Sequence, residues 1–148
     1  MNSLLHIPPP VYAALSLALC KGIDLLLPLS ANFAAPLVGV MIALPALALI
    51  VWAGLHFFLN KTTPVPTGTP SHLVVAGPYR FTRNPMYLGL LMLLASVVVF
   101  TGTPVYLLSP LSFFWITDRL FIPYEESKLE QIFAAEFAFF KISTRRWL

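Results

Sequence analysis

The densest group of residues able to do chemistry lies in the middle of the chain, from Gly77 to Gly89. It reads Gly77-Pro78-Tyr79-Arg80-Phe81-Thr82-Arg83-Asn84-Pro85-Met86-Tyr87-Leu88-Gly89. Pro85 suits the first turn of a helix, where free backbone N–H groups favour an anion or a carboxylate. Arg80 and Arg83 could add charge-assisted hydrogen bonds to it. Taken alone, the two arginines are more readily explained as topology signals that contact lipid headgroups.

A second polar group follows an apolar segment. Asp118 and Arg119 are adjacent, so on a helix they point to different faces and each needs its own partner. Glu125 and Glu126 come a few residues later, at the start of a predicted helix. Two carboxylates at that position stabilise the helix dipole, or they hold an amine or a ribose. Both interpretations stay open at this point.

The composition excludes most classes of protein. The chain has 148 residues, which predicts a single domain, 1–148. Hydrophobic residues make up 58% of it and charged residues 10%, against about 25% in soluble domains. A soluble enzyme, a disordered chain and a nucleic-acid binder are therefore excluded, the last despite a pI of 9.2. One cysteine and three scattered histidines form neither a disulfide framework nor a metal motif.

Four continuous apolar segments predict an integral membrane protein. They span about residues 11–29, 36–59, 85–100 and 104–122. A helix needs roughly 20 residues to cross the bilayer, so the third segment is short and needs flanking residues or a thinned bilayer. Continuous rather than alternating apolar runs favour helices over strands. We therefore expect an all-α bundle of four transmembrane helices.

The basic residues predict the orientation of this bundle. The connections at 30–35 and 101–103 contain no Lys or Arg. The loop 60–84 and the tail 123–148 contain seven, namely Lys61, Arg80, Arg83, Lys128, Lys141, Arg145 and Arg146. The positive-inside rule then places this loop and both termini in the cytoplasm.

The tail is predicted to be an amphipathic helix rather than a fifth span. Charges recur from Glu125 onward, while one face is apolar. Such a helix lies against the membrane or folds back over the bundle. Its apolar face consists of Leu129, Ile132, Phe133, Phe137 and Phe140.

The central motif resembles the signature of the membrane-embedded methyltransferases, which include isoprenylcysteine carboxyl methyltransferase and phosphatidylethanolamine N-methyltransferase. Its residues are Gly77-Pro78-Tyr79-Arg80-x-x-Arg83-Asn84-Pro85-Met86-Tyr87-x-Gly89. A second part of the signature follows as Glu125-Glu126-x-x-Leu129-x-x-x-Phe133, then Glu136, Phe137, Phe140 and Arg145-Arg146. Together the two parts span about residues 71–147, half of the chain.

The resemblance implies S-adenosyl-L-methionine as cofactor, bound at the cytoplasmic end of the bundle, with an opening from the bilayer for a lipidic or lipid-anchored acceptor. It implies cofactor contacts at Ser71, His72, Leu73, Val74, Tyr79, Asn84, Pro85, Met86, Tyr87 and Glu125. Arg83 is expected to receive the methionine carboxylate of the cofactor, together with the helix N-terminus.

The same resemblance leaves the methyl acceptor open. It implies an arginine that binds the acceptor, and Arg119 is the candidate in that region. An acceptor carboxylate needs no base, whereas an acceptor amine must lose a proton, and Glu126 is then the nearest candidate base. The family's His-Pro is Asn84-Pro85 here, a version that resembles the phospholipid branch and bacterial relatives of the carboxyl branch. We therefore expect a bacterial inner-membrane protein.

Three more positions depart from the family. Ala134 replaces a glycine, and Phe137 and Phe140 replace tyrosines.

Two other function classes stay open. A lipid reductase of the sterol or enone type would use NADPH and would need more basic residues for the phosphates. A small transporter or membrane scaffold would use charges inside the membrane, such as Lys21 and Asp24, and would leave the loop motif unexplained.

Overall fold

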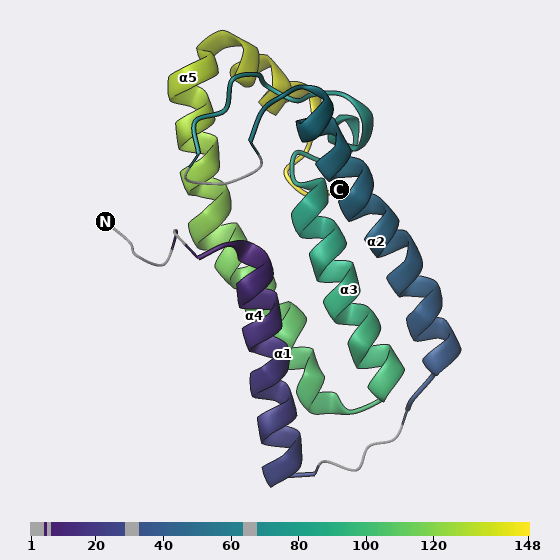
Figure 1. Ribbon diagram of the computed structural model, residues 1–148. Coiled ribbons are helices and arrows are strands. Elements are labelled where there is room, and N and C mark those ends of the chain that lie inside the picture. Colours follow the sequence, from purple (N-terminus) through teal and green to yellow (C-terminus); the bar gives the residue numbers. More distant parts are fainter. Residues whose placement is uncertain (1–4, 6, 29–32, 64–67) are drawn as a thin grey trace.

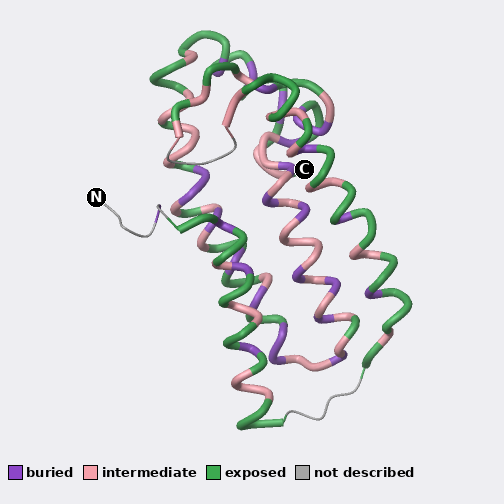
Figure 2. Tube along the Cα trace, in the orientation of Figure 1, coloured by how far each residue is buried: buried purple, intermediate pink, exposed green. Residues whose placement is uncertain are grey.

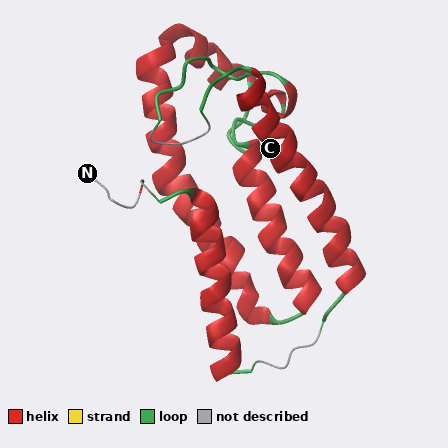
Figure 3. Ribbon diagram, viewed as in Figure 1, coloured by secondary structure: helices red, strands yellow, loops and turns green. Residues whose placement is uncertain are grey.

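The computed structural model describes residue 5 and residues 7–28, 33–63 and 68–148, and every regular element in them is helical (Figure 3). The all-α class is therefore as predicted. The long elements are α1 (Pro9–Leu26), α2 (Pro36–Leu59), α3 (Pro85–Thr101), α4 (Leu108–Ile116) and α5 (Ile122–Ser143). Shorter helical turns are η2 (Gly77–Arg80), η3 (Pro104–Leu107) and η4 (Thr117–Phe121).

Prolines mark the starts of these helices. α2 and α3 begin at Pro36 and Pro85, where a missing N–H leaves no internal hydrogen bond unmade. α1 begins at Pro9, two residues before the predicted start, for the same reason. The predicted end of that segment at Leu29 lies outside the described residues. α3 ends at Thr101, and the next residue, Gly102, adopts the left-handed conformation of a helix C-cap.

Three helical stretches are long and apolar enough to cross a membrane, namely Pro9–Leu26, Pro36–Leu59 and Pro104–Ser143. α3 is equally apolar but has only 17 residues. The chain therefore has the helices of an integral membrane protein, with α3 as the shortest candidate. Four crossings remain a prediction.

The fourth predicted span and the tail form one continuous helical stretch. It runs for 40 residues from Pro104 to Ser143, through the π-helical turn η4. At 1.5 Å per residue such a helix is about 60 Å long, twice the hydrocarbon thickness. Only its first half is apolar, so a membrane span that ends before Pro123, with α5 from Glu125 onward projecting beyond the membrane, remains a prediction from the sequence. α5 then bends at Ala134, whose φ is 35° and ψ −103° (Figure 1).

Small residues bring α2 and α3 close together. Gly39, Ala46 and Ala53 recur every seven residues along α2 and are all buried. A Cβ atom on Gly39 would lie 2.8 Å from Cβ of Phe100. The buried side of α3 and the exposed outer faces of α1 and α2 are visible in Figure 2. This close backbone approach is typical of helix pairs in membranes.

α1 lies beside α4 as the second helix pair (Figure 1). The hydroxyl groups of Ser16 and Ser109 lie 2.7 Å apart in this interface. The loop after α2, the start of α3, most of α5 and the C-terminus gather at one end of the bundle (Figure 1). The motif residues thus come together at that end, where Lys and Arg are concentrated.

Candidate functional site

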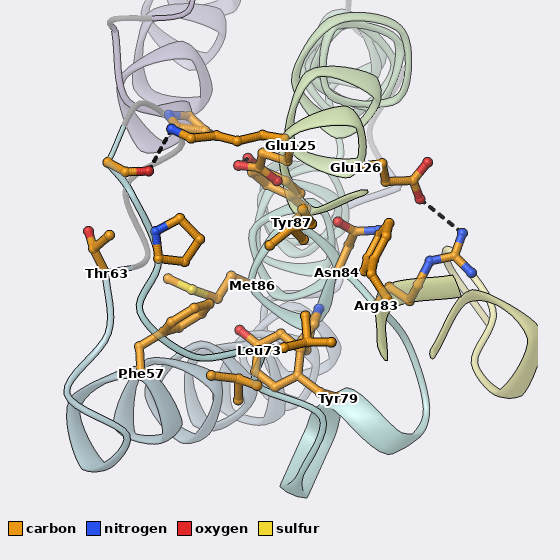
Figure 4. A pocket seen from close by; sticks show the side chains of 18 of the residues that line it. Phe57, Thr63, Leu73, Tyr79, Arg83, Asn84, Met86, Tyr87, Glu125 and Glu126 are labelled. Carbon is orange, nitrogen blue, oxygen red and sulfur yellow. Dashed lines mark hydrogen bonds and ion pairs between the residues drawn. The ribbon is translucent and has the colours of Figure 1, made fainter. Parts of the chain in front are cut away.

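A cavity of about 310 Å³ lies at this end of the bundle. Its walls come from the starts of α1, α3 and α5, the last turn of α2, the bent part of α5 and the loop before η2 (Figure 4). The lining residues are Pro8, Pro9, Pro10, Phe57, Thr63, Gly68, Pro70, His72, Leu73, Val74, Tyr79, Arg83, Asn84, Pro85, Met86, Tyr87, Leu90, Glu125, Glu126, Lys128, Leu129, Phe137 and Phe140.

A direct hydrogen bond joins α3 to α5 at the cavity. The Tyr87 hydroxyl donates to Oε1 of Glu125 over 2.6 Å. The pKa of the Glu125 carboxyl is raised to about 7, mainly by burial; the neighbouring Glu126 charge also raises it, while the Tyr87 bond and Lys128 act in the opposite direction. Figure 4 shows this carboxyl beside the Tyr87 ring at the cavity. Glu125 is therefore a carboxyl able to gain and lose a proton near neutral pH.

The adjacent Glu126 has the opposite environment. Its Oε1 accepts from Arg83 over 2.9 Å and its Oε2 from Arg146 over 2.7 Å. Burial acts against ionisation, but these bonds and the two guanidinium charges hold the pKa of Glu126 below its usual value. Figure 4 shows its carboxylate turned toward the guanidinium and away from Glu125. Glu126 therefore stays ionised and ties α5 to the start of α3.

The guanidinium of Arg83 is held by the protein itself. Nη1 donates to the carbonyl oxygens of Lys141, over 3.1 Å, and of Thr144, over 2.5 Å, and Nη2 donates to Glu126. Within the described residues its buried Nε has no hydrogen-bond partner. Arg83 thus lines the cavity, but both of its terminal nitrogens already have acceptors.

The last residues of the chain wrap around the start of α3. We call residues 144–147 the C-terminal segment. The Arg83 backbone N–H donates to the carbonyl oxygen of Arg145 over 2.9 Å. The Arg146 carbonyl oxygen accepts from Oγ1 of Thr82 over 3.0 Å and from Nδ2 of Asn84 over 2.9 Å. These bonds fix the turn that leads into Pro85.

Side chains of the C-terminal segment also contact the helix before α5. Nη1 of Arg146 lies 3.4 Å from Oδ1 of Asp118. The indole N–H of Trp147 donates to the same oxygen over 3.0 Å. The segment therefore joins the start of α3 to η4, which carries Asp118, and to α5, which carries Glu125 and Glu126.

The other side of the cavity is apolar. The rings of Phe57 and Tyr79 meet edge to face, with centroids 5.6 Å apart. Phe137 and Phe140 are buried with Ala53 of α2. Leu129 and Phe133 pack against the same cluster, whereas Ile132 is exposed. Four of the five residues of the predicted apolar face therefore pack onto α2 and the loop.

Most of the residues predicted for the site line this cavity. Ser71 does not line it. Instead, its hydroxyl donates to the carbonyl oxygen of Lys61 and its backbone N–H donates to Oγ1 of Thr62, so Ser71 holds the loop in place. Arg119 does not line the cavity either. Its side chain is 71% exposed, and its nearest ionic partner is Asp118, at 3.8 Å. Arg119, predicted as the residue that binds the acceptor, therefore lies outside this cavity.

Several lining residues were missed from the sequence. Lys128 is three residues after Glu125, so helical spacing could have placed it on the same face. Phe57 and residues 8–10 carry no local signal, because only the packing of α1 and α2 brings them to the cavity. Within the described residues no three His, Cys, Asp or Glu side chains come close enough together to hold a metal ion.

A family model described as phospholipid methyltransferase matches residues 29–136, which is more than half of the chain. The matched range contains both the Gly77–Gly89 motif and the Glu125-Glu126 pair. It ends before the C-terminal segment. Comparisons with curated proteins and with solved structures give no match.

Proposed function

Because the chain belongs to the phospholipid methyltransferase family, we propose that it transfers a methyl group from S-adenosyl-L-methionine to an amine on a lipid headgroup. Membrane-associated methyl transfer to lipids follows from the family. The cofactor and the acceptor amine are our proposals. The observation that carries them is the Tyr87–Glu125 pair at a cavity with an otherwise largely apolar wall.

The residues that line the cavity fit this cofactor. The volume of the cavity, about 310 Å³, is in the range of small-molecule sites, roughly 300–1,000 Å³. The aromatic faces of Phe57 and Tyr79 suit an adenine ring, and a carboxylate suits ribose hydroxyls or an ammonium group. The cofactor supplies an activated methyl group on a positively charged sulfur. We assign the binding of S-adenosyl-L-methionine to Leu73, Val74, Tyr79, Met86, Tyr87 and Glu125.

Arg83 and Glu126 are assigned different roles from those expected. Arg83 already donates to Glu126 and to two backbone carbonyl oxygens, so we propose that it positions the start of α3. Glu126 accepts from two arginines and has a lowered pKa, which makes it a weak base. We therefore propose Glu126 as a positioning residue too.

An acceptor amine must lose a proton before it can attack a methyl group, and Glu125 is the carboxyl with a suitable pKa. Its value of about 7 allows it to take that proton near neutral pH. Tyr87 donates a hydrogen bond to one of its oxygens and so orients it. An acceptor carboxylate would need no base, and the terminal nitrogens of Arg83 are already engaged by the protein.

We propose that the acceptor reaches the cavity sideways from the bilayer. Leu90 and residues 8–10 line the cavity, so its apolar wall continues along α3 and the start of α1. No residue of 104–116 lines the cavity, so this route does not run between α3 and α4. Each buried CH₂ group of an acyl chain would contribute about 0.8 kcal/mol.

Four membrane crossings, with the loop 60–84 and both termini in the cytoplasm of a bacterium, complete the proposal. The seven Lys and Arg residues of the loop and tail support this orientation. The cavity would then lie at the cytoplasmic interface, where both a soluble cofactor and a lipid headgroup can arrive.

The first test is calorimetry on detergent-solubilised protein with S-adenosylhomocysteine and, separately, NADPH. We expect binding of the former, weakened by Glu125→Gln on the order of tenfold to a hundredfold, because a buried bond to a charged group is lost. Arg145→Gln, which changes an exposed arginine outside the cavity, serves as the control. Binding of NADPH without S-adenosylhomocysteine would favour the reductase and end this proposal.

The second test concerns the acceptor. We expect methyl transfer from labelled cofactor to phosphatidylethanolamine, rising with acyl chain length and nearly absent for water-soluble glycerophosphoethanolamine. A lipid with a free carboxylate as its only acceptor should not be methylated. Equal turnover of the soluble and lipidic amines would exclude sideways access, and methylation of the carboxylate lipid alone would exclude the amine.

A further inference from the structure

A second cavity, of about 480 Å³, lies behind one wall of the candidate site. Leu73 and Phe140 line both cavities and therefore separate them. The second cavity is formed by the segment around η2 and the end of α5. Its lining residues are Leu73, Val75, Arg80, Glu136, Phe139, Phe140, Ser143 and Thr144.

Two opposite charges line this second cavity. Within the described part of the chain, the side chains of Arg80 and Glu136 make no hydrogen bond or ion pair, either with each other or with another residue. This contrasts with Arg83, Glu126 and Arg146, which form a connected network. A cation and an anion held apart in one cavity are complementary to a ligand that carries both charges.

The position of the cavity along α2 indicates what kind of ligand can reach it. A Cβ atom on Gly77, at the start of η2, would lie 2.3 Å from Nε2 of His56, so η2 touches the last turns of α2. Phe140 packs with Ala53 of α2. Figure 1 shows the last part of α5 lying over this end of α2. If α2, which is apolar up to its last turns, spans a bilayer, its end and the cavity beside it would lie at the depth of the headgroups.

Exposed apolar side chains line the cavity or adjoin its lining residues in the sequence: Phe139 lines it, Phe81 follows Arg80, and Ile142 precedes Ser143. Phe81 is 68% exposed, Phe139 73% and Ile142 87%. Exposed aromatic and aliphatic groups beside basic residues are typical of segments that lie in the membrane interface. These three side chains would contact acyl chains while Arg80 and Glu136 face the headgroup.

We infer that this second cavity binds the zwitterionic headgroup of a phospholipid, with Arg80 on the phosphate and Glu136 on the ammonium group. The guanidinium of an arginine suits phosphate oxygens, and a carboxylate attracts the cationic nitrogen. The inference shares the membrane placement with the proposed function but not its chemistry. The lipid bound here is not the methyl acceptor, because Leu73 and Phe140 separate it from Glu125.

The test uses the full-length protein in detergent and phosphatidylcholine as the probe, followed by native mass spectrometry. A choline nitrogen already carries four carbons, so the probe cannot act as an acceptor. The variants are Arg80→Gln and Glu136→Gln. Arg145→Gln is the matched control, because it removes the same charge from a residue outside both cavities. Phosphatidylglycerol, which is anionic only, and soluble glycerophosphocholine are the comparison ligands.

We expect one phosphatidylcholine to bind preferentially, and each cavity variant to raise its dissociation constant on the order of tenfold, as for loss of a charged hydrogen bond. Arg145→Gln should leave it unchanged, and binding of S-adenosylhomocysteine should be the same in all three variants. Equal effects of Arg80→Gln and Arg145→Gln would overturn the inference. So would a Glu136→Gln variant that binds like wild type, tighter binding of phosphatidylglycerol, or equal binding of the soluble headgroup.

Discussion

The Asn84 side chain donates a hydrogen bond of 2.9 Å to the backbone carbonyl oxygen of Arg146, 62 residues later in the chain. The residue before the α3 proline is thus bonded to the C-terminal segment rather than directed only at the cavity. Thr82 donates to the same oxygen over 3.0 Å. The start of α3 is therefore held in place from outside the cavity, and Asn84 serves both the cavity wall and this attachment.

Replacing Asn84 by aspartate should loosen this attachment while keeping the shape of the side chain. The amide donor becomes a carboxylate that faces the Arg146 carbonyl oxygen, so attraction turns into repulsion. A partly buried hydrogen bond lost in this way costs about 1–3 kcal/mol. Thermal denaturation in detergent should show a lower Tm for Asn84→Asp than for Asn84→Ala. Equal Tm values for the two variants would mean that the bond does not form.

Arg146→Gln should weaken S-adenosylhomocysteine binding about tenfold, on the scale of a bond between charged groups. The substitution removes one of the two cations that hold Glu126, together with the contact to Asp118. Arg145→Gln removes the same charge from the adjacent, exposed residue and should leave binding unchanged. Calorimetry on both variants checks this. Equal losses would show that these arginines act only through net charge.

The stability of the ligand-free protein should carry a pH signature of Glu125. Its pKa of about 7 in the folded state lies above the ordinary 4.5, so the folded state holds the proton more tightly between these values. This contribution to stability is complete below about pH 4.5, falls as the pH rises through the window, and is lost above about pH 7. Glu125→Gln lacks it.

The measurement compares Tm values of wild type and Glu125→Gln at about pH 5 and about pH 8 without ligand. The fall in Tm from the lower to the higher pH should be larger for wild type, and the difference between the two proteins isolates this one carboxyl. Parallel pH profiles would show that Glu125 titrates as an ordinary surface glutamate.

Ala134→Gly should stabilise the protein. Ala134 has a φ of 35° at the bend of α5, a conformation that costs a residue with a Cβ atom about 1–2 kcal/mol and glycine little. Ala138→Gly, at an exposed position of the same helix with ordinary helical geometry, should destabilise by about 0.5–1 kcal/mol. Thermal denaturation should therefore give shifts of opposite sign. A loss of stability in both variants would show that α5 is straight at Ala134.

Membrane orientation can be tested by labelling single introduced cysteines in intact cells. Cys20, the natural cysteine, is buried and should not react. Gln131→Cys on α5 should be shielded from a membrane-impermeant reagent, and Leu27→Cys, beyond the end of α1, should react. Both positions are exposed, so a difference reports the side of the membrane. Labelling of Gln131→Cys alone would reverse the proposed orientation.

The sequence by itself determined the helices and the family. Continuous apolar runs leave no alternative to helices in a bilayer, because each segment must satisfy its own backbone hydrogen bonds. Prolines at 36 and 85 then set where α2 and α3 begin, since their effect on the backbone is local. The Gly77–Gly89 motif and the Glu125-Glu126 pair were likewise visible as types and spacings of residues.

The division of roles within the polar residues was decided only by the tertiary structure. Glu125 and Glu126 are adjacent and chemically identical, yet one contacts Tyr87 in a poorly solvated cavity while the other lies between two arginines. Their pKa values move in opposite directions because burial raises that of Glu125, whereas Arg83, 43 residues away, and Arg146, near the C-terminus, lower that of Glu126.

The same holds for the tail. Its apolar face was visible as a periodic pattern. Such a face packs equally well onto a bilayer or onto a helix bundle, because the hydrophobic effect depends on the apolar area removed from water and not on which partner covers it. Contacts with Ala53 and Val74 place it over α2 and the loop. Nor could local pattern show that the C-terminal segment binds Thr82, Arg83 and Asn84, because backbone carbonyl oxygens carry no sequence signal. Where long-range hydrogen bonds and packing select among equivalent groups, only the folded chain decides.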